Sequence, residues 1–175
     1  MKKMIPPFVL SPSKDERKLL AAFASLLLCA SAQAQEDYSY ARRLYNNKAQ
    51  CQYCHGWAGD GAGDGQAGAA PSLRVTRLNR EQLIQVIQCG RPGTPMPRFD
   101  DQAYVDKRCY NVTEAELGSR TPQLPPGSPL TQREIDAVAD FILAKFKGRD
   151  KITREECEET FGKGSRACSD YGALP

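Results

Sequence analysis

The most constraining feature of this chain is the pentapeptide Cys51-Gln52-Tyr53-Cys54-His55, which contains the only histidine among 175 residues. Two cysteines separated by two residues and followed directly by histidine form the attachment sequence of a c-type haem. On one turn of helix, the two thiols can reach the two vinyl groups of one porphyrin while the imidazole points at the iron from the same side. A single histidine also excludes a bis-histidine haem and any metal site that needs several imidazoles.

Two other interpretations of the cysteine pair are weaker. Half of a zinc site needs a second pair of ligands, but the next cysteine is Cys89, 35 residues further on, and no second C-x-x-C occurs. A thioredoxin-like redox pair sits where a strand meets a helix, whereas here a helical pattern precedes the pair and the glycine-rich stretch 56–65 follows it. That stretch is not a P-loop either, because no Gly-Lys-Ser/Thr follows it.

The first 34 residues have the pattern of a secretory signal peptide. Five basic residues precede an apolar run from Leu19 to Ala32, and a small-x-small cleavage sequence ends at Ala34. The mature chain is therefore expected to begin near Gln35 and to have no stable membrane insertion. A lipid anchor at Cys29 is the less favoured alternative, because Leu28 stands where bacterial lipoproteins need a small residue.

Removal of this leader changes the charge balance. The whole chain has 24 Lys and Arg against 21 Asp and Glu, and 19 of each remain after residue 34. Nucleic-acid binding proteins need a cationic face to displace counterions, so a neutral mature chain argues against a nucleic-acid partner.

Three helices are predicted from apolar spacing and capping residues. The first, capped by Asp37 or Ser39, runs into the attachment sequence and carries Ala41 and Tyr45 on its packing side. The second begins after Asn79 and ends at Gly90, and the third begins after Thr131 and ends at Gly148. The fold class expected from these elements is all-α, with long loops.

Met96 lies between Pro95 and Pro97, which fix its backbone in extended geometry. A methionine that only filled a core would not need such a frame. Upstream, the segment Ala70-Pro71-Ser72-Leu73 follows the glycine-rich loop.

In this order, these features resemble the class I, mono-haem c-type cytochromes of bacteria, over residues 38–147. The resemblance implies one covalently attached haem c per chain, with thioethers at Cys51 and Cys54. It implies His55 and Met96 as axial ligands, the only protein ligands of the metal.

The resemblance also implies roles for two further residues of the cofactor site. The carbonyl of Pro71 would accept a hydrogen bond from His55 and fix its tautomer, although Ala70 departs from the glycine common in the family. Trp57 would pack beside the haem ring.

The remaining sequence extends this pattern in two places. The cytochrome domain, residues 35–148, has an insert at residues 97–130, and a tail follows at residues 149–175. Four cysteines outside the haem pair predict two disulfides in an exported protein. Order along the chain favours Cys89 with Cys109 and Cys157 with Cys168, while the other pairings and free thiols stay open.

The expected function is periplasmic single-electron transfer without catalysis, because an iron bound by both His55 and Met96 is closed to substrate. The partners would be a dehydrogenase as donor and a terminal oxidase or reductase as acceptor. One alternative is a haem subunit or acceptor dedicated to one periplasmic enzyme, such as a quinoprotein (PQQ) alcohol dehydrogenase. Another is a haem sensor or peroxidase-like enzyme in which Met96 dissociates.

The segment from Arg74 to Arg108 has a local charge of +3. This charge could steer a redox partner, or Arg91 and Arg98 could neutralise haem propionates.

Overall fold

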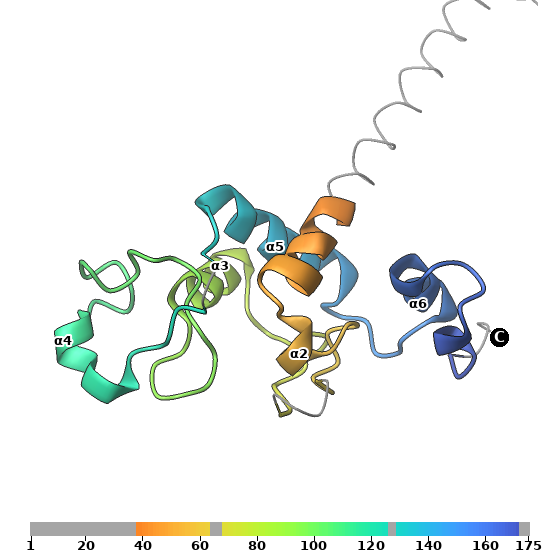
Figure 1. Cartoon of the computed structure of the whole chain (residues 1–175), viewed down its shortest axis with the longest axis horizontal. Coiled ribbons are helices and arrows are strands. Elements are labelled where there is room, and N and C mark those ends of the chain that lie inside the picture. The colour runs from red at the N-terminus through yellow and green to blue at the C-terminus, as the bar shows by residue number, and fades with distance from the viewer. Residues whose placement is uncertain (1–37, 64–67, 126–128, 172–175) are drawn as a thin grey trace, which may run out of the picture. The chain divides into compact units, whose positions relative to one another are not determined.

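The computed structural model describes residues 38–63, 68–125 and 129–171, which all belong to one compact unit that begins at Tyr38. In chain order its helices are the π-helix η1 (Leu44–Lys48), α2 (Gln52–His55), α3 (Arg80–Cys89), α4 (Glu114–Leu117), the 3₁₀ helix η2 (Gly118–Arg120), α5 (Gln132–Lys145), α6 (Arg154–Phe161) and the 3₁₀ helix η3 (Arg166–Cys168). No strand occurs within these ranges, and the predicted all-α fold class is confirmed (Figure 1).

At the N-terminal side, the predictions concern a signal peptide and the cap of the first helix. The predicted signal peptide, residues 1–34, and the candidate cap Asp37 lie outside the described residues. Ser39 is already inside a helix that covers residues 38–43 and continues into η1, so it is not the N-cap. None of the helices in the described ranges is long and apolar enough to cross a bilayer.

α3 and α5 pack side by side and supply half of the buried residues of the main core (Figure 1). Both begin with the predicted capping box, in which Asn79 pairs with Gln82 and Thr131 pairs with Glu134. Each box satisfies backbone N–H groups that the first helical turn leaves unpaired. The predicted N-terminal boundaries of both helices are therefore confirmed.

The helix before the attachment sequence packs on the end of α5, as predicted. Ala41 and Tyr45 are buried, and the Tyr45 ring lies 5.7 Å from the Phe141 ring and 5.3 Å from the Phe146 ring, measured between centroids. These aromatic contacts fix the direction from which the chain enters α2.

The insert and the tail each contain short helices that the sequence analysis did not predict. α4 and η2 lie in the insert, and α6 and η3 lie in the tail. Both predicted disulfides are present: Cys89 pairs with Cys109, and Cys157 pairs with Cys168. The first disulfide thus ties the insert to the end of α3, and the second closes the tail on itself.

Candidate functional site

α2 presents the predicted attachment residues on a single turn of helix. Cys51 is the N-cap of α2, and its carbonyl accepts a hydrogen bond from the His55 N–H at 2.9 Å. Cys51 and Cys54 are free and half-buried, whereas the other four cysteines of the described residues form disulfides. The turn therefore leaves two thiols and one imidazole available for a ligand.

Burial raises the pKa of the Cys51 thiol to about 12. The thiol is therefore protonated at neutral pH, which is the form whose S–H adds across a vinyl double bond. A zinc site would need thiolates, and within the described ranges no three His, Cys, Asp or Glu side chains converge in a way that could hold a metal ion.

The imidazole of His55 is oriented by Pro71. Its Nδ1 lies 3.0 Å from the Pro71 carbonyl oxygen. Because a carbonyl oxygen can only accept, Nδ1 carries the proton and the lone pair of Nε2 is left free for a metal. The predicted hydrogen bond is thereby confirmed, while the ligation itself stays a prediction.

The protonation of His55 is set mainly by burial, which lowers its pKa. The hydrogen bond to Pro71 acts in the opposite direction, and the positive charge of Arg91 adds to the lowering. The neutral imidazole, which is the form that binds iron, is favoured.

The loop after His55 depends on glycine at two points. Gly56 has φ 76°, and its carbonyl accepts a hydrogen bond from the buried Tyr45 hydroxyl at 2.8 Å. Gly59 has φ 67°, and a Cβ there would come within 2.5 Å of the Phe146 ring. The loop thus passes directly over the end of α5, which an L side chain at Gly59 would prevent.

Met96 lies half-buried against the main core, and so does Cys51. Its backbone N–H donates to the Thr94 hydroxyl at 3.2 Å, and its carbonyl accepts from the Arg91 N–H at 3.2 Å. These two bonds close a tight loop from Arg91 to Met96. Met96 and the attachment turn, which are 41 positions apart in the sequence at their nearest, thus both border the main core.

The residues at this site fit a c-type haem. The donor set is two thiols, one imidazole with a free Nε2 and one thioether, and half-buried apolar side chains such as Leu73 and Ile84 border the same core. In addition, the Nε of Arg98, two residues after Met96, is buried and has no hydrogen-bond partner among the described residues. A haem carboxylate would supply the missing acceptor.

Residues 36–114, a little under half of the chain, match the family described as cytochrome c oxidase, cbb3-type, subunit III. These residues form a c-type cytochrome domain, which confirms the predicted cytochrome c fold. The match covers the attachment sequence, Pro71 and Met96, and a class I, mono-haem domain fits it. No curated protein and no solved structure matches the sequence.

The match indicates the broad function of this domain: electron transfer with a haem cofactor, in an exported or membrane-associated protein. The match ends at Glu114, the first residue of α4, so the second part of the insert, residues 115–130, and the whole tail lie beyond it.

Trp57 has neighbours that the sequence analysis did not predict. Its indole ring lies edge-to-face against Phe161 at 5.1 Å and against Tyr171 at 5.5 Å, and both partners belong to the tail. The expected role of Trp57 beside the haem stays a prediction. What surrounds the indole in the structure is aromatic packing that joins the glycine-rich loop to the tail.

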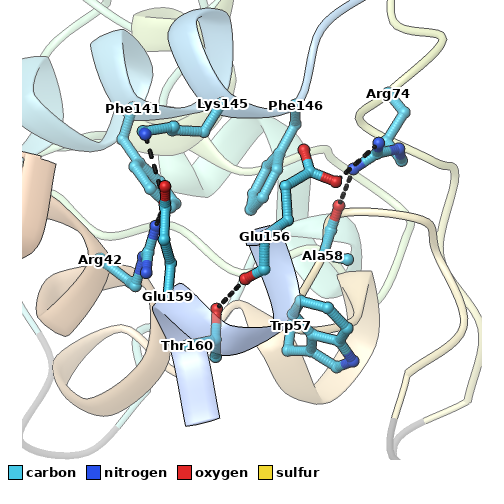
Figure 2. Close-up of a pocket in the computed structure, with 10 residues that line it drawn as sticks. All are labelled: Arg42, Trp57, Ala58, Arg74, Phe141, Lys145, Phe146, Glu156, Glu159 and Thr160. Carbon is cyan, nitrogen blue, oxygen red and sulfur yellow. Dashed lines mark hydrogen bonds and ion pairs between the residues drawn. The ribbon is translucent and has the colours of Figure 1, made fainter. Parts of the chain in front are cut away.

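Arg74 is a second anchor of the tail that sequence reasoning missed. Its side chain is only 4% exposed, and it donates to the carbonyl of Ala58 at 3.0 Å, to that of Arg149 at 2.7 Å and to that of Lys151. An ion pair with Glu156 on α6 completes the shell at 3.3 Å (Figure 2). Arg74 therefore crosslinks the loop behind His55 to the tail.

Figure 2 shows the seam between α5 and α6, in which Glu156, Glu159 and Thr160 face Phe141, Lys145 and Phe146. The cavity in this seam has a volume of about 20 Å³, enough for about one water molecule. It is a packing gap and not a ligand site.

The structure also changes the interpretation of the basic segment from Arg74 to Arg108. Arg74 is buried, and four more of its seven basic residues form ion pairs: Arg80 with Asp140, Arg98 with Glu114, Lys107 with Glu116, and Arg108 with Asp106 and Asp100. Arg77 and Arg91 are the exposed members with no ion pair among the described residues. The local charge of +3 is therefore not an open basic patch.

Proposed function

We propose that this cytochrome is a periplasmic single-electron carrier whose haem c is bound through Cys51 and Cys54, with His55 and Met96 as axial ligands. The observation that carries the proposal is the hydrogen bond from His55 Nδ1 to the Pro71 carbonyl, because it leaves Nε2 free beside the two thiols. When bound, the haem supplies one-electron chemistry between ferric and ferrous iron, and a thioether ligand raises its potential.

The protein's own residues would then fix the geometry of both ligands. Pro71 holds the imidazole, and the bonds of Arg91 and Thr94 to Met96 hold the loop of the thioether. Rigid ligands lower the rearrangement needed between the two oxidation states, and burial in an apolar core tunes the potential.

The donor is expected to be a dehydrogenase and the acceptor a terminal oxidase or reductase. The description of the matching family names an oxidase subunit, which favours an oxidase on the acceptor side. A second candidate is a haem subunit or acceptor dedicated to one enzyme, such as a quinoprotein alcohol dehydrogenase. The disulfide-closed tail and the second part of the insert favour it, because they add surface beyond the residues that match the family.

The proposal is tested on the purified exported protein. The haem should stay with the polypeptide in acidified acetone, and a potentiometric titration should follow a one-electron curve. A low-spin oxidised spectrum with the far-red absorption band of a sulfur–iron bond is expected. High-spin features in place of that band would instead support the sensor or peroxidase-like alternative.

The two electron-transfer candidates differ in partner binding. A shuttle should elute alone in size-exclusion chromatography with candidate enzymes, since weak redox encounters are small and transient. A dedicated subunit should co-elute with its enzyme.

A further inference from the structure

The insert is bonded to the residues at which α3 ends and the loop carrying Met96 begins. The last residue of α3, Cys89, is bonded to Cys109 of the insert. The Tyr104 hydroxyl donates to the Cys89 carbonyl at 2.7 Å, and the Tyr110 hydroxyl donates to the next carbonyl, that of Gly90, at 2.8 Å. One disulfide and two phenol groups therefore fasten two successive residues.

These carbonyls belong to the group that a helix leaves without intrahelical partners at its C-terminus. Gly90, with φ 65°, turns the chain out of α3 into the loop that closes between Arg91 and Met96. A Cβ at Gly90 would come within 2.7 Å of Pro97, so the two ends of this loop lie against each other. A contact that holds Gly90 in place therefore also holds the base of the Met96 loop in place.

The insert also has a small core of its own. Its buried members are Cys89, Ala103, Tyr104, Cys109 and Leu117. Cys89 is the one member that comes from outside residues 97–130. The insert is thus built around the residue that precedes the Met96 loop and is not an extension of the main core.

The backbone that carries Tyr110 is strained. Tyr110 and Asn111 have φ values of 53° and 58°, in the left-handed region that residues other than glycine and asparagine seldom adopt. Such conformations persist where surrounding contacts determine them, and they mark positions with a function. At Tyr110 the left-handed turn accompanies the bond between its hydroxyl and Gly90.

We infer that Tyr110, together with Tyr104 and the Cys89–Cys109 disulfide, is a positioning residue for Met96. The inference rests on the proposed function, since it takes Met96 as an axial ligand. By holding the base of the loop, the two hydroxyls limit how often the thioether leaves the iron.

The test measures binding of imidazole to the ferric holoprotein, which requires Met96 to leave first. The apparent affinity is the intrinsic affinity multiplied by the fraction of molecules that are open. Tyr110→Phe removes one hydrogen bond from the closed state, so imidazole should bind about five-fold more tightly than to the wild type. Tyr104→Phe should act in the same direction.

Tyr45→Phe is the matched control, because the Tyr45 hydroxyl also donates to a glycine carbonyl at 2.8 Å, that of Gly56 on the His55 side. It should lower global stability in urea and leave imidazole binding unchanged. If Tyr110→Phe and Tyr104→Phe bind imidazole no more tightly than Tyr45→Phe, the inference is wrong while the proposed function stands. A wild-type ferric spectrum without the sulfur–iron band would overturn both.

Discussion

One disulfide ties the insert of this cytochrome to α3 and another closes the tail, yet the two extensions contact the rest of the domain differently. At the base of the Met96 loop the insert uses neutral groups, because the hydroxyls of Tyr104 and Tyr110 donate to backbone carbonyls. The tail adds charge to its aromatic contact with Trp57, because Glu156 pairs with buried Arg74 and Glu159 pairs with Arg42 and Lys145.

This difference predicts which conditions should loosen the insert and which should loosen the tail. Hydrogen bonds between neutral groups respond little to salt or to moderate changes of pH. Partly exposed ion pairs are screened by salt and are lost when the carboxylate is protonated. The contacts that hold the base of the Met96 loop and those that hold the loop after His55 should therefore weaken under different conditions.

The largest effect is expected from Met96→Ala, which removes what the insert positions. The haem should stay attached through Cys51 and Cys54, while the reduction potential falls by on the order of 100 mV or more and small ligands gain access to the iron. Potentiometric titration measures the change. Leu143→Ala, which also truncates a half-buried side chain against the main core, should keep the potential close to that of the wild type; an equal fall there would remove Met96 from its role.

On the tail side, Arg74→Ala should cost about 3–5 kcal/mol of unfolding free energy, because it leaves three carbonyls without their donor and removes the buried partner of Glu156. Urea denaturation measures the loss. The control is Arg80→Ala, which breaks an exposed ion pair with Asp140 and should cost far less, because exposed ion pairs contribute little to stability. Equal losses in the two variants would contradict the assigned difference between buried and exposed arginines.

Acid should loosen the tail before it affects the insert. Burial alone would raise the pKa of Glu159, but hydrogen bonds and charge from Arg42 and Lys145 outweigh it and hold the pKa below its ordinary value of 4.5. A carboxylate with a lowered pKa adds stability above that value and loses it as the pH falls further. The expected result is a shift of the Trp57 ring resonances in NMR spectra of the reduced protein below about pH 4.5.

Trp57 is the only tryptophan of the chain and contacts the tail directly, which makes it the reporter for this experiment. Glu159→Gln should shift the same resonances already at neutral pH and flatten their acid dependence. Resonances that stay fixed until the whole protein unfolds would show that Glu159 does not hold the tail.

High pH should have a smaller effect, and it should loosen the insert and leave the tail in place. Burial raises the pKa of Tyr104 to about 12, with a further rise from Tyr110 and a partial offset from Arg98. The neutral hydroxyl therefore contributes fully below its ordinary value of 10, and this contribution is lost as the pH rises toward 12. The far-red sulfur–iron band should weaken in this window while the Trp57 resonances hold. Loss of the band well below pH 10 would show that the ionisation of a group other than Tyr104 causes the loss.

Much of the candidate site could be predicted because its signals are local. The attachment sequence lies within five residues, and the capping boxes at Asn79 and Thr131 lie within four. The disulfides join cysteines that are 20 and 11 positions apart, so proximity along the chain was enough to favour the correct pairing.

The sequence does contain a capping signal for the short helices of the insert and the tail. Thr113 and Glu116 form a capping box at α4, and Thr153 and Glu156 form one at α6, with the same Thr-x-x-Glu spacing as at α5. Neither stretch has the apolar periodicity of a core helix. α6 buries only Cys157, because a disulfide fastens it where α5 relies on a hydrophobic face.

The surroundings of Trp57 and Arg74 could not be predicted by this kind of reasoning. Arg74 meets Glu156, 82 positions further along the chain, and Trp57 meets Phe161. No local pattern marks an arginine that will be buried by a segment so distant in sequence. The same applies to Tyr110, whose bond to Gly90 depends on a left-handed turn at a residue that seldom adopts one.

The central claim is that one haem is bound through Cys51 and Cys54 and that Met96 ligates its iron opposite His55. Met96 is the only methionine after residue 4, so its methyl group gives a single assignable signal in the proton NMR spectrum of the reduced protein. Ligation would hold this methyl over the porphyrin face, where the ring current moves its resonance far upfield, and this is the result we predict. A methyl resonance at its ordinary position, in a protein that carries haem, would contradict the account.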